Sequence, residues 1–461
     1  MCLSEALPIA EAAGSVASGN PEALLALAAF PANAQRATPV TVAANTSTAI
    51  TAPQRTAAIA EIVRHIGERY VFPDRVPAIT SRLKEGLASG RYNQDNPTTF
   101  ANLVTEDLRA ASNDRHMYLN YAPAEYAATL AAKGDKPDNS ALDAMWNRQA
   151  LRANHGLEEM RILPGNVRYL RITDFQWIED QTGAAYDAAM QFLRGGDAVI
   201  IDLRGNGGGS HAAVRYLLSH FMDGDQLDIT FLEAGKPPIQ SRTLEYLPGG
   251  RLKGKPLYVL IDHHVGSGAE AFAYDVQQFH LGTLIGATTA GAANNNEFSP
   301  VAPGFMLSCS FGRPEHPVSH TNWEAVGVAP DVPVDPARAL DVAHALALKT
   351  LTARTNADPA DQADWTWARA AAESRVHPPQ IPQRKLRALA GAYGSQRVVW
   401  SEGALHLIRH GQPVRLLPLS EDGLFTVDGL DDQFRVRLTG GAMETQWNDE
   451  PSPTRFPRSN G

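Results

Sequence analysis

The chain has 461 residues, of which 44% are hydrophobic and 20% are charged, and its net charge is −9. This length and composition are ordinary for a globular protein of two or three domains. The acidic balance, without any block of Lys and Arg, argues against a nucleic-acid partner. No run of 18 or more apolar residues occurs, which argues against a membrane span.

The N-terminal residues permit two interpretations. Residues 23–31 are apolar, and Ala32-Asn33-Ala34 is typical of a signal-peptide cleavage site. The acidic residues Glu5, Glu11 and Glu22 stand where such a signal needs positive charge. We favour export to the periplasm or the cell exterior, and a flexible tail on a cytoplasmic protein stays open. Residues 1–52 are therefore predicted to be a candidate export signal followed by a Thr/Ala/Pro-rich linker.

A helical domain is predicted over residues 53–122. Apolar side chains recur at helical spacing in two stretches, which are Ile59, Ile62, Val63 and Ile66, and then Phe100, Leu103, Val104 and Leu108. Pro97 suits the start of the second helix. The domain is expected to end in the polar turn 112–116 and a strand-like segment from Met117.

An α/β core is predicted over residues 123–352. Strand candidates at 167–172, 198–203 and 257–261 alternate with helical patterns at 185–193, 214–221 and 269–280. Such alternation predicts a mostly parallel sheet covered by helices. A polar linker is predicted over 353–384. Short alternating segments separated by turn residues then predict a small antiparallel β-domain over 385–455.

A glycine-rich segment, Asp202-Leu-Arg-Gly-Asn-Gly-Gly-Gly-Ser210, follows one predicted strand and precedes a helix. Glycines there allow a tight turn with bare N–H groups aimed at a ligand. A dinucleotide site is disfavoured because the spacing is not G-x-G-x-x-G. A purely structural turn and an oxyanion hole both remain open, and the oxyanion hole requires a nucleophile.

Ser267 is the candidate nucleophile. It lies between flanking glycines in a predicted strand-to-helix turn, at the edge of the sheet where α/β proteins bind ligands. The segment is not G-x-S-x-G, and until a base is found the better explanation of Ser267 by itself is a helix N-cap. No lysine lies between Lys255 and Lys349, so a local Ser–Lys dyad is excluded and a histidine becomes the candidate base.

The residues alone leave the base and its partner undecided. His116, His263 and His264 are the histidines considered. The acidic residue Glu324, beside Trp323 in a Gly/Pro-containing loop, either orients a histidine or caps a turn. Only two cysteines are present, Cys2 and Cys309, and there is no C-x-x-C or H-E-x-x-H. We therefore predict no disulfide framework, no metal and no cofactor.

Taken in order, four segments resemble a known family. They are Asp114-Arg-His116, the glycine-rich segment 202–209, Ser267-Gly-Ala-Glu270 and Trp323-Glu-Ala-Val-Gly-Val-Ala-Pro-Asp331. Together they resemble the tail-specific, or C-terminal processing, serine peptidases. The resemblance spans roughly residues 55–350 and is strongest to the branch with the tricorn core protease and the modules of interphotoreceptor retinoid-binding protein.

The resemblance implies a crotonase/ClpP-like spiral α/β core and peptidase activity on peptide or protein substrates. It assigns Ser267 as nucleophile, His116 as general base and Glu324 as the residue that orients the histidine. The implied oxyanion donors are the N–H groups of Gly208, with Gly207 as the alternative, and Gly268. Relatives that use lysine carry it in the loop after the nucleophile's helix, where this chain has 289–293 without lysine.

Some residues depart from the family pattern. Gly266 stands where relatives often carry a larger side chain, and Gly268 replaces a common alanine, so a looser turn is expected. Only 49 residues separate His116 from Asn166, too few for a peptide-binding PDZ insert. Selectivity for free C-termini is therefore not expected. The alternative function is non-catalytic binding of hydrophobic small molecules such as retinoids or fatty acids, but the presence of all three triad residue types favours the enzyme.

Overall fold

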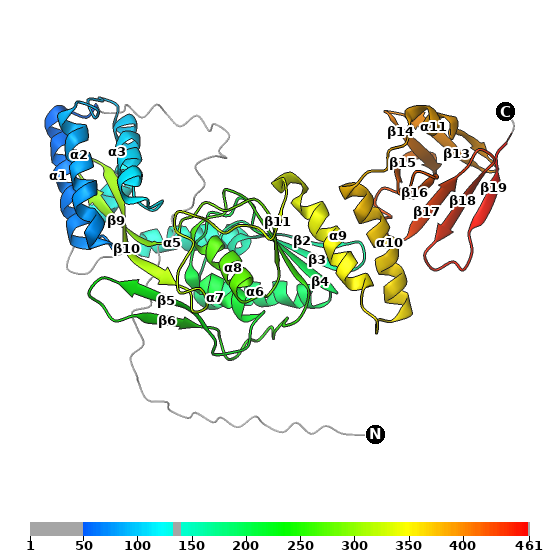
Figure 1. The fold of residues 1–461 in the computed structure, drawn as a ribbon, viewed down its shortest axis with the longest axis horizontal. Helices are drawn as coiled ribbons and strands as arrows, with labels where there is room; N and C mark the ends of the chain where they lie inside the picture. Colours follow the sequence, from blue (N-terminus) through cyan, green and yellow to red (C-terminus); the bar gives the residue numbers. More distant parts are fainter. Residues whose placement is uncertain (1–48, 132–139, 460–461) are drawn as a thin grey trace, which may run out of the picture.

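The structure is a computed structural model that describes residues 49–131 and 140–459. Figure 1 shows a helical N-terminal region, a central α/β region and a β-rich C-terminal region. The candidate export signal lies outside the described residues, so localisation stays a prediction. None of the described helices combines the length and the apolar character that crossing a membrane requires.

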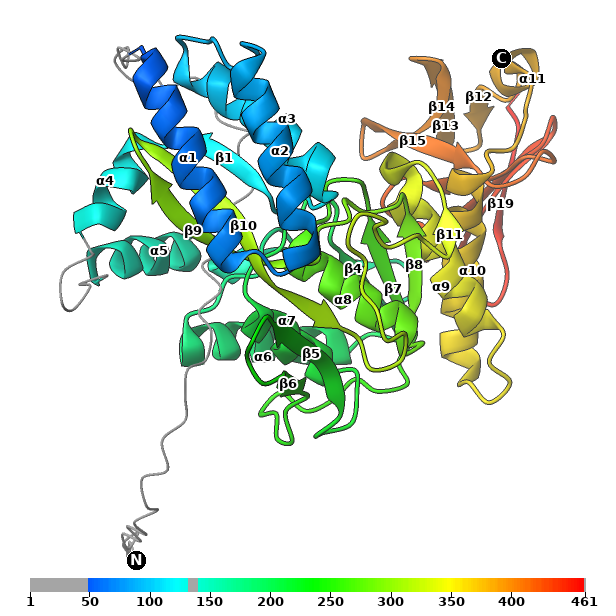
Figure 2. The same cartoon turned by 60° about the vertical axis from the view of Figure 1, so that its left-hand side comes forward.

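Three helices make up the N-terminal region, namely α1 (Ala52–Arg69), α2 (Val76–Ala88) and α3 (Pro97–Ser112). The Asn96 side chain accepts the Thr99 N–H and Pro97 follows it, which begins α3 as predicted. The apolar stripes pack into one core, which also includes Phe305 and Leu307 from a strand far along the chain. Figure 2 shows the helices lying over that strand.

The central sheet has six strands in the order β11-β8-β7-β4-β3-β2. Their bounds are β2 Leu157–Leu163, β3 Val167–Ile172, β4 Ala198–Asp202, β7 Leu257–Ile261, β8 Thr283–Gly286 and β11 Val332–Pro333. All pair in parallel except β2, which runs antiparallel to β3. The mostly parallel sheet agrees with the alternation in the sequence.

Helices cover both faces of this sheet. Alternate residues of β4 point to opposite faces. On one face, Val199 and Ile201 pack beneath α6 (Glu179–Arg194), α7 (His211–Ser219) and α8 (Ser267–Gln278). On the other face, Ala198 and Ile200 pack beneath α9 (Ala339–Thr352) and α10 (Pro359–Val376). Strands buried on both faces read as continuous apolar runs, which is why β4 and β7 could be located from sequence.

A second, antiparallel sheet joins the helical region to the core. It has the order β1-β10-β5-β6, with β9 also paired to β10. The bounds are β1 Tyr118–Tyr121, β5 Leu227–Glu233, β6 Ile239–Arg242, β9 Asn295–Val301 and β10 Phe305–Glu315. The pairing of Tyr118 with Ser308 brings the end of the helical region beside residues almost two hundred positions later.

The region predicted as a linker over 353–384 contains a packed helix that the sequence pattern did not indicate. Helix α10 buries Trp365, Ala368 and Ala372 against α9. Its buried face is built mainly from alanine, so its apolar stripe is weak in the sequence. The domain boundaries themselves stay predictions.

The other short elements of the described chain are η1 Pro73–Arg75, η2 Asn154–Gly156, η3 Pro336–Arg338, α4 Pro123–Ala131, α5 Ser140–Arg152 and α11 Gln383–Ala388.

The C-terminal region is an eight-stranded antiparallel meander in sequential order. Its strands are β12 Gly391–Tyr393, β13 Gln396–Ser401, β14 Ala404–Arg409, β15 Gln412–Pro418, β16 Leu424–Val427, β17 Phe434–Leu438, β18 Ala442–Trp447 and β19 Thr454–Pro457. A bridge between Tyr393 and Arg458 brings the first and last strands together, so the sheet is nearly closed around a core of its own. The fold class is confirmed: an α/β core with an N-terminal helical region and a small antiparallel β-region.

Candidate active site

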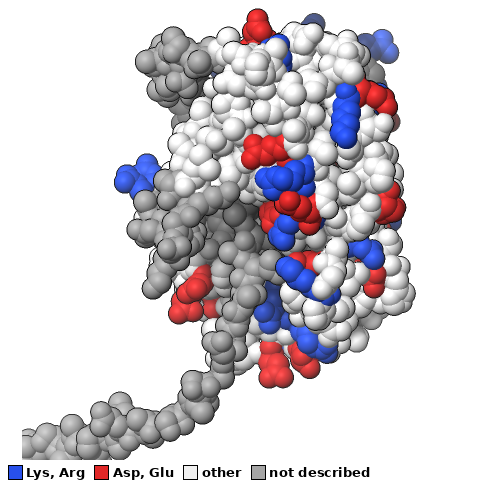
Figure 3. Space-filling model, turned by 90° about the vertical axis from the view of Figure 1, so that its left-hand side faces the viewer, with Lys and Arg blue, Asp and Glu red and all other residues white. Residues whose placement is uncertain are grey.

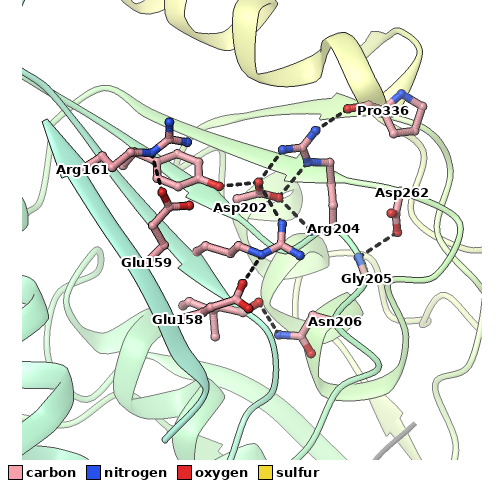
Figure 4. A network of polar contacts seen from close by, with 12 residues as sticks. Glu158, Glu159, Arg161, Asp202, Arg204, Gly205, Asn206, Asp262 and Pro336 are labelled. Carbon is pink, nitrogen blue, oxygen red and sulfur yellow. Dashed lines mark hydrogen bonds and ion pairs between the residues drawn. The ribbon is translucent and has the colours of Figure 1, made fainter. Parts of the chain in front are cut away.

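The glycine-rich loop begins at a buried ion pair at the end of β4 (Figure 4). The Asp202 carboxylate accepts hydrogen bonds from Arg204 Nη2 at 2.6 Å and from the Tyr169 hydroxyl at 2.7 Å. Arg204 also donates to the Pro336 carbonyl, beyond the sheet. Burial by itself would raise the pKa of Asp202, but the Arg204 donors hold this pKa below its ordinary value. The ion pair therefore fixes where the loop leaves the strand.

Asn206 clamps the middle of the loop. Its Nδ2 donates to the Ile172 carbonyl at 3.0 Å, and its Oδ1 accepts the Gly208 N–H at 2.8 Å. Its backbone carbonyl accepts the Gly266 N–H at 3.0 Å. The buried Asn206 thus ties the loop to β3 through its side chain and to the turn that carries Ser267 through its backbone carbonyl.

Ser267 occupies a strained position as the first residue of α8, in the turn that follows β7. Its φ is +48°, in the left-handed region that residues other than glycine rarely adopt. The loop presses on it closely, because a Cβ at Gly208 would lie 2.7 Å from the Ser267 Cβ. A Cβ at Gly268 would lie 2.9 Å from the Gly209 carbonyl oxygen, so glycine at 268 permits close packing here. The side chain of Ser267 is partly exposed.

Glu270, one turn into α8, holds this turn to the loop that follows β8. The side chain is fully buried and accepts from the Ser267 N–H, the Thr289 hydroxyl and the N–H groups of Gly291 and Ala292, at 2.5–3.0 Å. Burial raises the pKa of Glu270, and these donors oppose the rise.

The same loop also holds Glu324. Glu324 Oε2 accepts the N–H groups of Ala293 and Asn294 at 2.7 and 2.9 Å, and its Oε1 accepts the Arg115 N–H at 3.1 Å. The four consecutive backbone N–H groups of 291–294 therefore donate to two carboxylates. Those of Gly291 and Ala292 donate to Glu270, and those of Ala293 and Asn294 donate to Glu324. This places Glu324 in a fixed relation to the serine's helix.

His116 lies beside Glu324 just before β1. Ligand atoms of Asp114, His116 and Glu324 all lie within 4.8 Å of one another. The Asp114 carboxylate accepts the backbone N–H of His116 at 2.9 Å, and the backbone carbonyl of His116 accepts the Ser308 hydroxyl at 2.5 Å. The antiparallel sheet thus brings the predicted base and its predicted partner together, although they are far apart in the sequence.

The protonation of the pair is set by burial and by Asp114. Burial first, and then the Asp114 carboxylate, raises the pKa of Glu324 to about 7. Burial lowers the pKa of His116, which Asp114 opposes. A neutral imidazole at neutral pH is the form that accepts a proton.

Two matches with protein-family models cover most of the region just described. The model for peptidase family S41 matches residues 166–334, and the model for the N-terminal domain of S41 peptidases in eukaryotic IRBP matches residues 43–153. Together they span more than half of the chain. The chain belongs to peptidase family S41. It is therefore a serine-type peptidase that acts on protein or peptide substrates.

Remote likenesses to solved structures accompany these matches. A lipoprotein from Streptococcus agalactiae aligns at 15% identity with a TM-score of 0.44, covering 65% of this chain and 98% of that one. The photosystem II D1 C-terminal processing protease aligns at 15% identity with a TM-score of 0.40, covering 62% of this chain and 94% of that one. The tricorn protease aligns at 14% identity with a TM-score of 0.40, covering 65% of this chain and 37% of that one.

In this S41 peptidase the predicted site residues are only partly connected. His116 lies close to Glu324, and Ser267 is linked to Glu324 through Glu270 and the segment 291–294. Within the described chain no hydrogen bond joins the Ser267 hydroxyl to His116, and His116 Nδ1 has no partner. His263 and His264 are exposed and stack on each other at 3.9 Å.

The predicted oxyanion donors differ in availability. The Gly208 N–H is donated to Asn206, whereas no acceptor is found for the N–H of Gly207 or Gly268 among the residues that the structure describes. Three residues that position the site had no assigned role in the sequence analysis. They are Asn206, Glu270 and Asn294, whose Nδ2 donates to Asp114 at 2.9 Å. Glu270 was noted only as part of a motif, and nothing local in the sequence pairs it with 289–292.

Proposed function

We propose that this S41 peptidase cleaves peptide bonds with Ser267 as nucleophile, His116 as general base and Glu324 as the carboxylate that stabilises the imidazolium. The observation that carries the proposal is the segment 291–294, whose N–H groups hold Glu270, beside the serine, and Glu324, beside the histidine. A purely structural serine would not need a buried carboxylate network that connects it to a histidine–glutamate pair.

The chemistry follows from these roles. His116 takes the proton of the Ser267 hydroxyl as the oxygen attacks the scissile carbonyl carbon, and it returns the proton to the leaving amine. Water then hydrolyses the acyl-enzyme by the same proton transfers in reverse order. Substrate binding has to bring the serine and histidine into hydrogen-bond contact, because catalytic hydrogen bonds are often long before substrate is bound.

The negative oxygen of the intermediate is proposed to accept the N–H of Gly268 and an N–H of the glycine-rich loop. Gly207 and Gly268 are open, whereas Gly208 must first exchange its bond to Asn206. Each oxyanion donor contributes about 10²–10³ in turnover.

Labelling with a fluorophosphonate probe tests the nucleophile. Wild type should label at one serine, and Ser267→Ala and His116→Ala should not, while kcat for a peptide substrate falls by at least about 10⁴-fold in both. Ser81→Ala, which removes an exposed serine on α2, is the matched control and should label fully. Undiminished labelling of Ser267→Ala would refute the assignment. A folded wild type that never labels would favour the binding of hydrophobic small molecules instead.

A further inference from the structure

The cluster of Asp114, His116 and Glu324 has an arrangement that the peptidase mechanism does not require. Among the described residues it is the one group of three or more His, Cys, Asp or Glu side chains whose ligand atoms lie so close together, within 4.8 Å. A catalytic triad needs a single carboxylate at its histidine. Here two carboxylates from distant parts of the chain meet at one imidazole.

The oxygen atoms of the cluster retain capacity for a further partner. Asp114 Oδ2 accepts from Asn294 and Tyr70, but Oδ1 accepts only the His116 N–H. Glu324 Oε2 accepts two N–H groups, but Oε1 accepts only that of Arg115. Each carboxylate oxygen offers about two lone-pair positions, so one oxygen of each residue remains open.

The imidazole points to a missing partner as well. His116 is only 9% exposed, and its Nδ1 is buried without a hydrogen-bond partner. Buried polar atoms are almost always satisfied. An orphaned imidazole nitrogen in a cluster that also has two open carboxylate oxygens therefore indicates a further ligand for the cluster.

A divalent transition-metal ion fits this donor set. Zn²⁺ takes imidazole nitrogen and carboxylate oxygen at about 2.0–2.2 Å, so tetrahedral ligand atoms stand about 3.3 Å apart. The ligand atoms of the three residues, within 4.8 Å of one another, lie near this spacing. The N–H groups of Arg115, Ala293 and Asn294 already hold Glu324, as outer contacts do in metal sites. Glu324 is partly exposed, so the cluster is accessible to solvent at this residue.

We propose that Asp114, His116 and Glu324 form a binding site for a divalent transition-metal ion, Zn²⁺ in particular, whose occupation switches the peptidase off. A neutral imidazole that gives one nitrogen to the metal carries its proton on the other, so it cannot accept the proton of Ser267. The inhibitory part rests on the proposed role of His116 as base, whereas the binding part does not.

Calorimetric titration of ZnCl₂ into the full-length, tag-free, chelator-treated protein tests the binding part. One Zn²⁺ per chain is expected for wild type and for Ser267→Ala, and no binding of Mg²⁺, which prefers all-oxygen sites. His116→Gln and Glu324→Gln should weaken binding by about 100-fold or more. His211→Gln is the matched control, because it removes a different histidine–carboxylate pair, 3.5 Å from Asp228, and should bind as wild type does. Thermal unfolding would confirm that each variant is folded.

Peptidase activity is then measured against Zn²⁺, with recovery by chelator. Loss of activity at the concentration that saturates the calorimetric site supports the switch. Equal affinity in wild type and both ligand variants, or no binding to wild type, overturns the site. Full activity of the loaded enzyme overturns the switch alone. Failure of the metal-free enzyme to label at Ser267 would instead count against the proposed triad and leave the binding result intact.

Discussion

In the proposed mechanism, a single residue, Glu324, sets the pH range of the reaction. Its pKa is raised to about 7 by burial and by the Asp114 carboxylate. Glu324 must be ionised to stabilise the imidazolium, so kcat/KM of the metal-free enzyme should rise with pH through about 7. Asp114→Asn removes the neighbouring negative charge, which lowers the pKa of Glu324 and of His116, and the rise should move to lower pH.

The measurement is the pH dependence of kcat/KM for both proteins with the same peptide. Asp95→Asn is the control, because it removes an exposed carboxylate that pairs with Arg55, remote from the histidine. An unchanged midpoint in Asp114→Asn would show that the two carboxylates do not interact.

At the scale of elements, Glu270 joins helix α8 to the loop that holds Glu324. Glu270→Gln replaces one acceptor oxygen by an NH₂ group that faces backbone donors, so at least one buried N–H loses its partner. We expect the free energy of unfolding to fall by about 2–3 kcal/mol and kcat/KM to fall with it. Chemical denaturation and steady-state kinetics measure the two effects. Glu245→Gln, at an exposed position, should change neither.

The parts of the site that a local pattern encodes could be predicted from the sequence. The apolar runs of β4 and β7 located the two turns, and the strand-to-helix position of Ser267 followed from them. The meeting of His116 with Glu324 depends on the pairing of Tyr118 with Ser308, a contact between distant segments that no periodicity indicates. Only the family resemblance connected these residues. The hydrogen-bond networks of Asn206 and Glu270 also depend on tertiary contacts. The glycine-rich sequence of the loop does not indicate that the Gly208 N–H is donated to Asn206.

At the scale of the whole molecule, the proposed active site and the helices that join the C-terminal region lie on opposite faces of the central sheet. Helices α9 and α10 cover one face, and α8 with Ser267 covers the other. Helix α10 also contacts the C-terminal region. Its Arg375 forms an ion pair with Asp431 at 2.6 Å, and its Trp367 ring lies beneath the guanidinium of Arg435. The face of the molecule in Figure 3 carries acidic and basic side chains intermixed, without a patch of one sign.

Trp365→Ala should lower the folding stability without changing the catalytic activity of the folded protein. The side chain is 3% exposed and packs between α10 and the sheet, so its loss should lower the free energy of unfolding by about 3–5 kcal/mol. The kcat of the folded fraction should stay near that of wild type, because the site lies on the other face. Denaturant titration and kinetics at a low temperature test this. Tyr246→Ala, at a residue 79% exposed, is the control for removing an aromatic side chain.

The left-handed backbone at Ser267, the proposed nucleophile, lowers the folding stability of the chain. A side chain with a Cβ is strained at φ +48°, whereas glycine adopts this conformation without penalty. Ser267→Gly should therefore raise the melting temperature, by the equivalent of about 1 kcal/mol, while abolishing turnover. A laboratory selection for heat resistance alone would discard the serine, and a lower melting temperature for this variant would show that the turn carries no strain. The proposed nucleophile thus serves the reaction at a cost in the folding stability of the chain.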